Sequence, residues 1–105
     1  MIPPQLRSFV FQLIDATNSG AVQWTPGEWP AFFCSHKDFT IHLASRPREY
    51  DETTLLLMRI ESPDGSLAFF EVSQYEEDFV TMNALFDSVS VNASNMAQKL
   101  QNFFD

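Results

Sequence analysis

The segment 54–73, TLLLMRIESPDGSLAFFEVS, constrains the fold more than any other part of the sequence. Two apolar runs in it flank the four residues Ser62-Pro63-Asp64-Gly65. Proline fixes the backbone for the second position of a type I turn, and glycine adopts the left-handed conformation that follows. The sequence therefore predicts a β-hairpin with a bulge, in which Pro63, Asp64 and Gly65 form a three-residue loop.

This loop also sets the register of the two strands, because it places Ser62 opposite Ser66. Side chains then alternate between the two faces of the hairpin with a period of two residues. One face is entirely apolar and is the expected core side: Leu56, Met58, Ile60, Ala68, Phe70 and Val72. The other face is mixed and pairs Leu57 with Glu71, Arg59 with Phe69, and Glu61 with Leu67.

Helical spacing of apolar residues is found on both sides of the hairpin. It predicts a helix over 4–18, and a second helix that starts after Ser73 and ends near Val91. Asn92 is expected to cap a third helix, whose apolar stripe is Met96, Leu100 and Phe103. The helix over 4–18 carries few charges for a surface helix, which suggests burial on more than one side or contact with a partner.

Short apolar or alternating runs between the first helix and the hairpin predict strands over 21–24, 31–35 and 39–43. The polar stretch 45–52 is expected to be an exposed loop. Consecutive strands with short connections favour a meander. We therefore expect one α+β domain over 1–105, with an N-terminal helix, an antiparallel meander of about five short strands and two C-terminal helices.

This plan resembles that of small uncharacterised bacterial proteins with a helix–meander–helix layout. The matching features are Trp24, the strand over 39–43, the Asp64-Gly65 turn and the helical stretch from Leu85 to Phe103. The Phe-rich segments and the Asn-rich start of the last helix depart from the pattern. The resemblance covers most of the chain, implies this fold and implies no activity.

The formal net charge of −8 argues against several partners. Nucleic acids and anionic lipids both require basic surface, and the one basic spot, Arg46-Pro47-Arg48, is followed at once by acidic residues. The single cysteine excludes an internal disulfide. No apolar stretch is long enough for a membrane span, and the first residues lack the pattern of a signal peptide, so a cytoplasmic protein is expected.

Cys34, His36 and His42 are the candidates for metal or nucleophile chemistry. If residues 36–39 form the turn between two strands, Cys34 and His42 lie on opposite faces, whereas a loop one residue longer would bring them together. No nucleotide-binding, hydrolase or metalloprotease motif occurs in the sequence. We therefore expect no catalytic site, no cofactor and no metal.

Surplus apolar residues predict instead a surface that contacts another protein or a second copy of the chain. The candidate partner-binding residues lie in the region of the tryptophans and on the mixed face of the hairpin: Trp24, Trp29, Leu55, Leu57, Leu67 and Phe69. The preferred interpretation is a non-enzymatic protein-interaction or regulatory subunit.

Two alternatives remain open. The first is an acidic protein of the immunity or antitoxin type, or a nucleic-acid mimic, that binds a basic partner through the carboxylates of 49–52 and 76–78. The second is a small enzyme or ligand binder that uses Cys34, His36 or His42.

Overall fold

The expected α+β architecture is present in the computed structural model, which describes residues 1–28, 30–47 and 53–105. A short 3₁₀ helix η1 (Pro4–Leu6) leads into α1 (Arg7–Ser19). The strands follow as β1 (Thr25–Pro26), β2 (Ala31–His36), β3 (Phe39–Pro47), β4 (Thr54–Glu61) and β5 (Leu67–Ser73). The chain closes with α2 (Phe79–Ser94) and α3 (Met96–Lys99).

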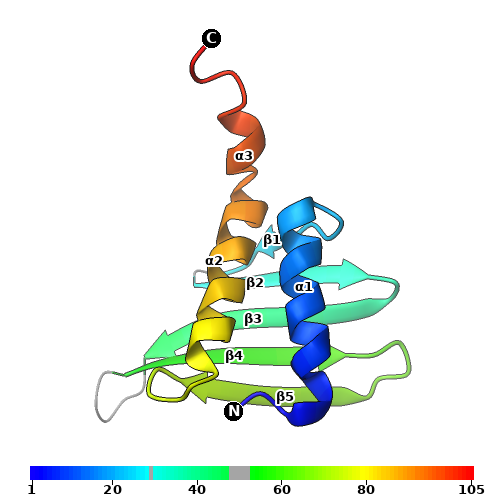
Figure 1. Cartoon of the computed structure of the whole chain (residues 1–105). Helices are drawn as coiled ribbons and strands as arrows, with labels where there is room; N and C mark the ends of the chain where they lie inside the picture. Colours follow the sequence, from blue (N-terminus) through cyan, green and yellow to red (C-terminus); the bar gives the residue numbers. More distant parts are fainter. Residues whose placement is uncertain (29, 48–52) are drawn as a thin grey trace.

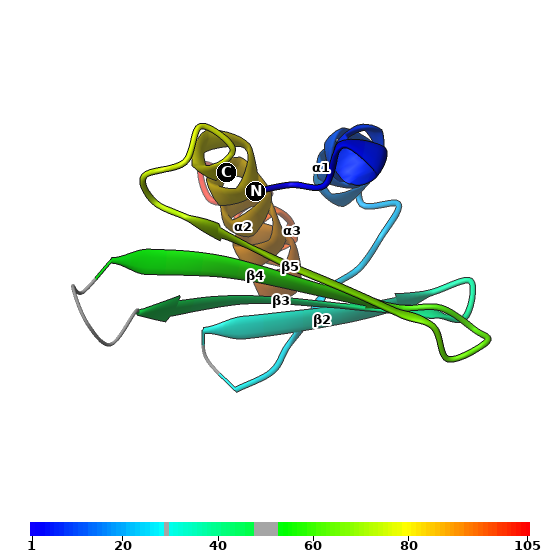
Figure 2. The same cartoon turned by 90° about the horizontal axis from the view of Figure 1, so that it is seen from below.

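The strands form one antiparallel sheet in the order β1-β2-β3-β4-β5, which is the expected meander. Both α1 and α2 lie on the same face of this sheet, side by side, as Figures 1 and 2 show. The molecule therefore has two layers. Among the described residues, no helix has the length and apolar character that a membrane span requires.

The hairpin of β4 and β5 has the predicted register, with Leu56 opposite Val72 and Met58 opposite Phe70. Its loop closes through two backbone hydrogen bonds, from the Ser62 N–H to the Ser66 carbonyl at 2.9 Å and from the Gly65 N–H to the Ser62 carbonyl at 3.0 Å. Gly65 has a φ of 89°, the left-handed conformation that the bulge requires.

The core lies between the sheet and the two helices, and the apolar face of the hairpin contributes Leu56, Met58, Phe70 and Val72 to it. Ile60 is only half-buried, and Ala68 is exposed, so the prediction that Ala68 belongs to the core is wrong. The reason is geometric: the tip of the β4–β5 hairpin extends past α1, as Figure 1 shows, so no helix covers it.

The predicted strand over 21–24 is also wrong, because these residues form an irregular connection and the first strand comes later, at Thr25–Pro26. Trp24 is nevertheless fully buried. Its indole Nε1–H donates to the Thr17 Oγ1 at 3.0 Å, and its backbone N–H donates to the Asn92 Oδ1 at 2.8 Å. The connection is thus held by specific polar contacts to α1 and α2 rather than by sheet pairing.

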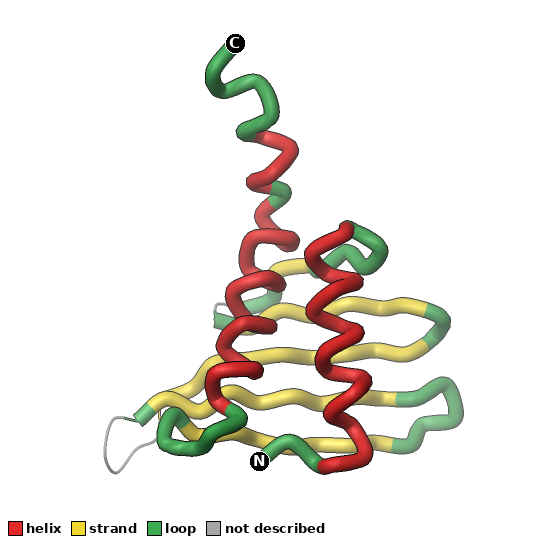
Figure 3. The backbone as a smooth tube through the Cα atoms, viewed as in Figure 1, coloured by secondary structure: helices red, strands yellow, loops and turns green. Residues whose placement is uncertain are grey.

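The largest differences from the predicted boundaries lie in β3 and in the C-terminal helices. Residues 45–47 belong to β3, where they pair with β4, and only the remainder of the predicted loop lies outside the described residues. The second helix begins at Phe79 and continues through Asn92 to Ser94. The helical path is interrupted at Asn95, whose φ is 57°, and Figure 3 shows this as a short green break between two red stretches.

Candidate functional site

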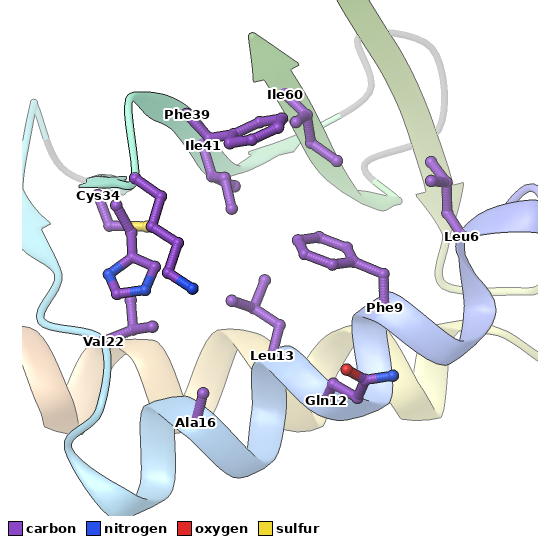
Figure 4. Close-up of a pocket in the computed structure, with 12 residues that line it drawn as sticks. Leu6, Phe9, Gln12, Leu13, Ala16, Val22, Cys34, Phe39, Ile41 and Ile60 are labelled. Atoms are coloured by element: carbon purple, nitrogen blue, oxygen red, sulfur yellow. The ribbon is translucent and has the colours of Figure 1, made fainter. Parts of the chain in front are cut away.

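An apolar groove of about 530 Å³ separates part of α1 from the sheet. We call it the α1 groove and show it in Figure 4. One wall is built by η1 and α1, with Leu6, Phe9, Leu13 and Ala16. The other wall comes from the connection after α1 and from β2, β3 and β4: Val22, Cys34, Phe39, Ile41 and Ile60.

Strand register explains why the sheet side of the α1 groove is apolar. Cys34 pairs with Ile41, and Ile41 pairs with Ile60, so these three side chains form one row across β2, β3 and β4. Residues paired across a sheet point to the same side. All three line the groove together with residues of α1, so the row lies on the helix face of the sheet. The helix side follows from the spacing of Phe9, Leu13 and Ala16 along one face of α1.

Three polar residues contribute to the lining of the α1 groove, Gln12 of α1 and His36 and Lys37 at the β2–β3 turn. Lys37 and Asp38 have φ values of 51° and 65°, as a two-residue hairpin turn of type I′ requires. Lys37 thereby brings a positive charge to the lining of a groove that is otherwise almost entirely apolar.

The thiol of Cys34 is poorly suited to nucleophilic chemistry. Burial raises its pKa to about 11, and a hydrogen bond with the backbone of Ile41 opposes this rise only in part. The thiol is therefore protonated at neutral pH, whereas the nucleophile is the thiolate. Cys34 acts in this site as an apolar wall.

The two histidines lie on different sides of the sheet. Cys34 and His36 both line the α1 groove, whereas His42 pairs with Phe33 on the opposite face, with ring centroids 6.1 Å apart. Burial, followed by the charge of Arg59, lowers the pKa of His42. The predicted separation of Cys34 and His42 is confirmed, and within residues 1–28, 30–47 and 53–105 no three His, Cys, Asp or Glu side chains gather as metal ligands would.

A second unusual feature is the end of the chain, residues 96–105, which we call the C-terminal segment. Its apolar side chains are exposed, from 42% for Met96 and 50% for Leu100 to 68% for Phe103 and 95% for Phe104. Backbone hydrogen bonds from Leu100 to Met96 and from Phe103 to Leu100 keep it in helical turns. In Figure 1 it extends away from the sheet, beyond the end of α1.

The predicted partner-binding residues have different environments. Trp24, Leu55 and Leu57 are buried within this chain, so in this conformation their side chains are closed to a partner. Leu55 and Leu57 belong to β4, which has a neighbouring strand on each side. Leu67 and Phe69 lie on the outer strand β5 and are more than 60% exposed, so their role in partner binding stays a prediction. Trp29 lies outside the described residues.

In the acidic run 76–78, the carboxylates of Glu76 and Asp78 both make contacts within the chain. Asp78 accepts two hydrogen bonds from the Arg7 guanidinium, at 2.8 and 3.2 Å, and a third from the Ile2 N–H at 2.8 Å. Glu76 accepts from the Ser73 N–H and forms an ion pair with the amino group of Met1, both at 2.8 Å. These contacts lower the pKa of both carboxyl groups, with the bonds from Arg7 and from the Met1 amino group as the largest causes.

Sequence reasoning missed the α1 groove and the exposed position of the C-terminal segment. The low charge of 4–18 was the available signal for the groove, because a helix with few charges has an apolar face that needs cover. The stripe Met96, Leu100 and Phe103 was recognised, but spacing alone does not tell whether such a stripe is covered. The carboxylates of 49–52 lie outside the described residues, so their predicted role stays a prediction.

Comparison of the chain with protein-family models, with curated proteins and with solved structures gave no match.

Proposed function

We propose that this chain is a non-enzymatic protein-interaction or regulatory subunit whose contact element is the C-terminal segment. The observation that carries the proposal is the exposure of four apolar side chains on one short segment: Met96, Leu100, Phe103 and Phe104. Exposed apolar residues are common singly, whereas several gathered on one segment are typical of a surface that contacts another molecule, and a protein partner is the contact proposed for this segment.

The spacing of these residues supports a helical mode of binding. Met96, Leu100 and Phe103 stand at positions i, i+4 and i+7, the pattern with which an amphipathic helix enters an apolar groove. Apart from Ala97, the positions between them are polar: Gln98, Lys99, Gln101 and Asn102. The rings of Phe103 and Phe104 are in edge contact, with centroids 4.8 Å apart, which gives the segment a compact aromatic end.

The two alternatives receive less support. A cysteine enzyme needs a thiolate with a base beside it, and the raised pKa of Cys34 removes the first requirement. Binding of a basic partner needs free carboxylates, and in the run 76–78 both Glu76 and Asp78 already accept internal hydrogen bonds. An interaction role requires neither group.

The test is a comparison of three immobilised proteins as baits for an extract of the cells that make this chain. They are the wild type, Phe103→Glu and the control Val80→Glu, which adds the same charge at an exposed apolar position of α2. We expect at least one protein, this chain included, to bind the wild type and the control and to be reduced more than about tenfold on Phe103→Glu.

Circular dichroism should give the same spectrum for the three proteins, because both substituted side chains are mostly solvent-exposed. Equal capture by all three baits would contradict the proposal, since the C-terminal segment would then contribute nothing to binding. A turnover assay that detects hydrolysis dependent on Cys34 would contradict it as well.

A further inference from the structure

We propose that the partner of the C-terminal segment is a second copy of this chain, and that the segment docks in the α1 groove of that copy. The inference rests on the proposed function and names the partner. It joins two features of the described structure, an exposed apolar helical segment and a concave apolar groove.

The two features match in size and chemistry. A volume of about 530 Å³ lies within the range of about 300–1,000 Å³ that is typical of sites that enclose a small molecule. Leu100, Phe103 and Phe104 are three exposed apolar side chains that the segment can place in this groove. The helix wall of the α1 groove, with Phe9 and Leu13, provides the apolar surface that an entering helical segment packs against.

Charge favours the same pairing. The chain has a net charge of −8, so a positive group next to an apolar site is uncommon on its surface. Lys37 is such a group, and within residues 1–28, 30–47 and 53–105 the ion pairs are Met1 with Glu76 and Arg7 with Asp78, which leave Lys37 unpaired. Asp105 follows the exposed Phe103 and Phe104 directly, so a docked segment can bring its carboxylate to Lys37.

A segment cannot reach the α1 groove of its own chain in this structure. The groove is lined by His36 and Lys37 of the β2–β3 turn. In Figure 1, α1 lies between this turn and α2, and the segment continues from α2 past the sheet. The Asn95 N–H donates to the Asn92 carbonyl at 3.2 Å and ties the start of the segment to the end of α2, while bonds from Lys99 to Asn95 and from Leu100 to Met96 keep it helical. The groove is therefore free for the segment of another copy.

Exchange between two copies closes the assembly. If each chain gives its segment and receives the other, the contact is made twice around a two-fold axis and no groove stays open. This arrangement is a reciprocal dimer.

A complementation experiment distinguishes this contact from nonspecific association of apolar surfaces. Phe103→Glu damages the segment and leaves the α1 groove intact, while Phe39→Glu damages the groove and leaves the segment intact. Both side chains are exposed, by 68% and 43%, so neither change removes a core residue. Val80→Glu, at 76% exposure, is the matched control outside both features.

Masses are measured by sedimentation equilibrium over a wide concentration range, on the full chain. We expect a dimer for the wild type and the control, and dissociation constants raised more than about tenfold for each single variant. An equimolar mixture of Phe103→Glu and Phe39→Glu should regain a heterodimer, because one segment and one groove remain intact in it. Neither variant alone has such a pair.

A monomeric wild type, or a mixture that stays monomeric, overturns the inference. If the wild type is monomeric but captures a cellular protein that Phe103→Glu does not, the proposed function stands. Only the identification of the partner as a second copy is then wrong. A final experiment titrates the monomer with decanoate, which tests whether the α1 groove binds a small apolar molecule instead. Saturable binding that Phe39→Glu abolishes, without self-association of the wild type, would make the α1 groove a small-molecule site and would also overturn the inference.

Discussion

Two stretches near the end of the chain have the same apolar pattern and opposite environments. In α2, three side chains are completely buried in the core between the sheet and the helices: Met82, Leu85 and Val89. In the C-terminal segment, Met96, Leu100 and Phe103 have comparable helical spacing and are 42–68% exposed. Periodicity thus predicts a helix and its apolar face, whereas burial depends on whether another element reaches that face.

The largest expected loss of stability is for a substitution in the buried core. Phe70→Ala removes a ring from the core beneath the helices and should lower the free energy of unfolding by about 3–5 kcal/mol, since a cavity remains. Urea unfolding at low protein concentration measures the change. A loss below about 1 kcal/mol, the range of surface substitutions, would show that this face of the hairpin is not the core side.

Leu85→Ala tests the α2 stripe itself. Leu85 is fully buried, so we expect a loss of about 2–5 kcal/mol in the same measurement. The conservative variant Leu85→Met should cost less than about 1.5 kcal/mol, because it preserves most of the side-chain volume. Similar small losses for both variants would erase the distinction between α2 and the C-terminal segment.

Asn92 holds the buried part of the molecule together by polar contacts. Its amide donates to the carbonyls of Thr17 and Val22, at 3.0 and 2.9 Å, and accepts from the Trp24 N–H. Asn92→Ala leaves these partners unsatisfied and should cost about 1–3 kcal/mol. Ser88→Ala, one turn earlier in α2, is a control expected to stay near the wild type. Equal values for the two variants would count against this role.

Acid should weaken the contact between Arg7 and Asp78. The folded-state pKa of Asp78 lies below its unfolded value, so its stabilising contribution is present at neutral pH and is lost as the pH falls below about 4, through the folded pKa. The stability difference between wild type and Asp78→Asn should therefore shrink in urea titrations at successively lower pH. A difference that stays constant down to strong acid would contradict this assignment.

The smallest effect is expected for Leu100→Ala, the exposed counterpart of Leu85→Ala. At protein concentrations below the range of self-association, its free energy of unfolding should stay within about 0.5 kcal/mol of the wild type. At high concentration the wild type should become more stable than the variant, because binding of a second copy stabilises the folded state. A large loss at low concentration would mean that the segment packs on its own chain.

Much of the sheet was predictable because local signals agreed. The Pro63-Asp64-Gly65 loop and the alternation of apolar residues both specify one register for β4 and β5, and that register is present. The β2–β3 turn likewise places Cys34 opposite Ile41 as expected. Ala68 was missed because its exposure depends on where the helices end above the sheet, which no strand pattern encodes.

The candidate site was less predictable, because its parts are far apart in the sequence. The α1 groove combines Leu6 and Phe9 with Ile60, residues that only the assembled layers bring together. Asn92 looked like a helix cap, since the pattern that signals a cap is local, and its actual partners lie about 70 residues earlier. An aromatic residue near a turn suits both a core and an interface, so the sequence alone does not distinguish the buried Trp24 from a surface residue.

The outer strand β5 has a practical consequence for handling the protein. In the described part of the chain β5 pairs with β4 alone, and on its open side the Met1 amino group donates to the Glu71 carbonyl at 2.8 Å. An unpaired strand rim is a template for intermolecular β-pairing and aggregation, and Glu71 is the one charged residue between Leu67 and Ser73. A purification tag fused ahead of Met1 would disturb the contact that shields this rim.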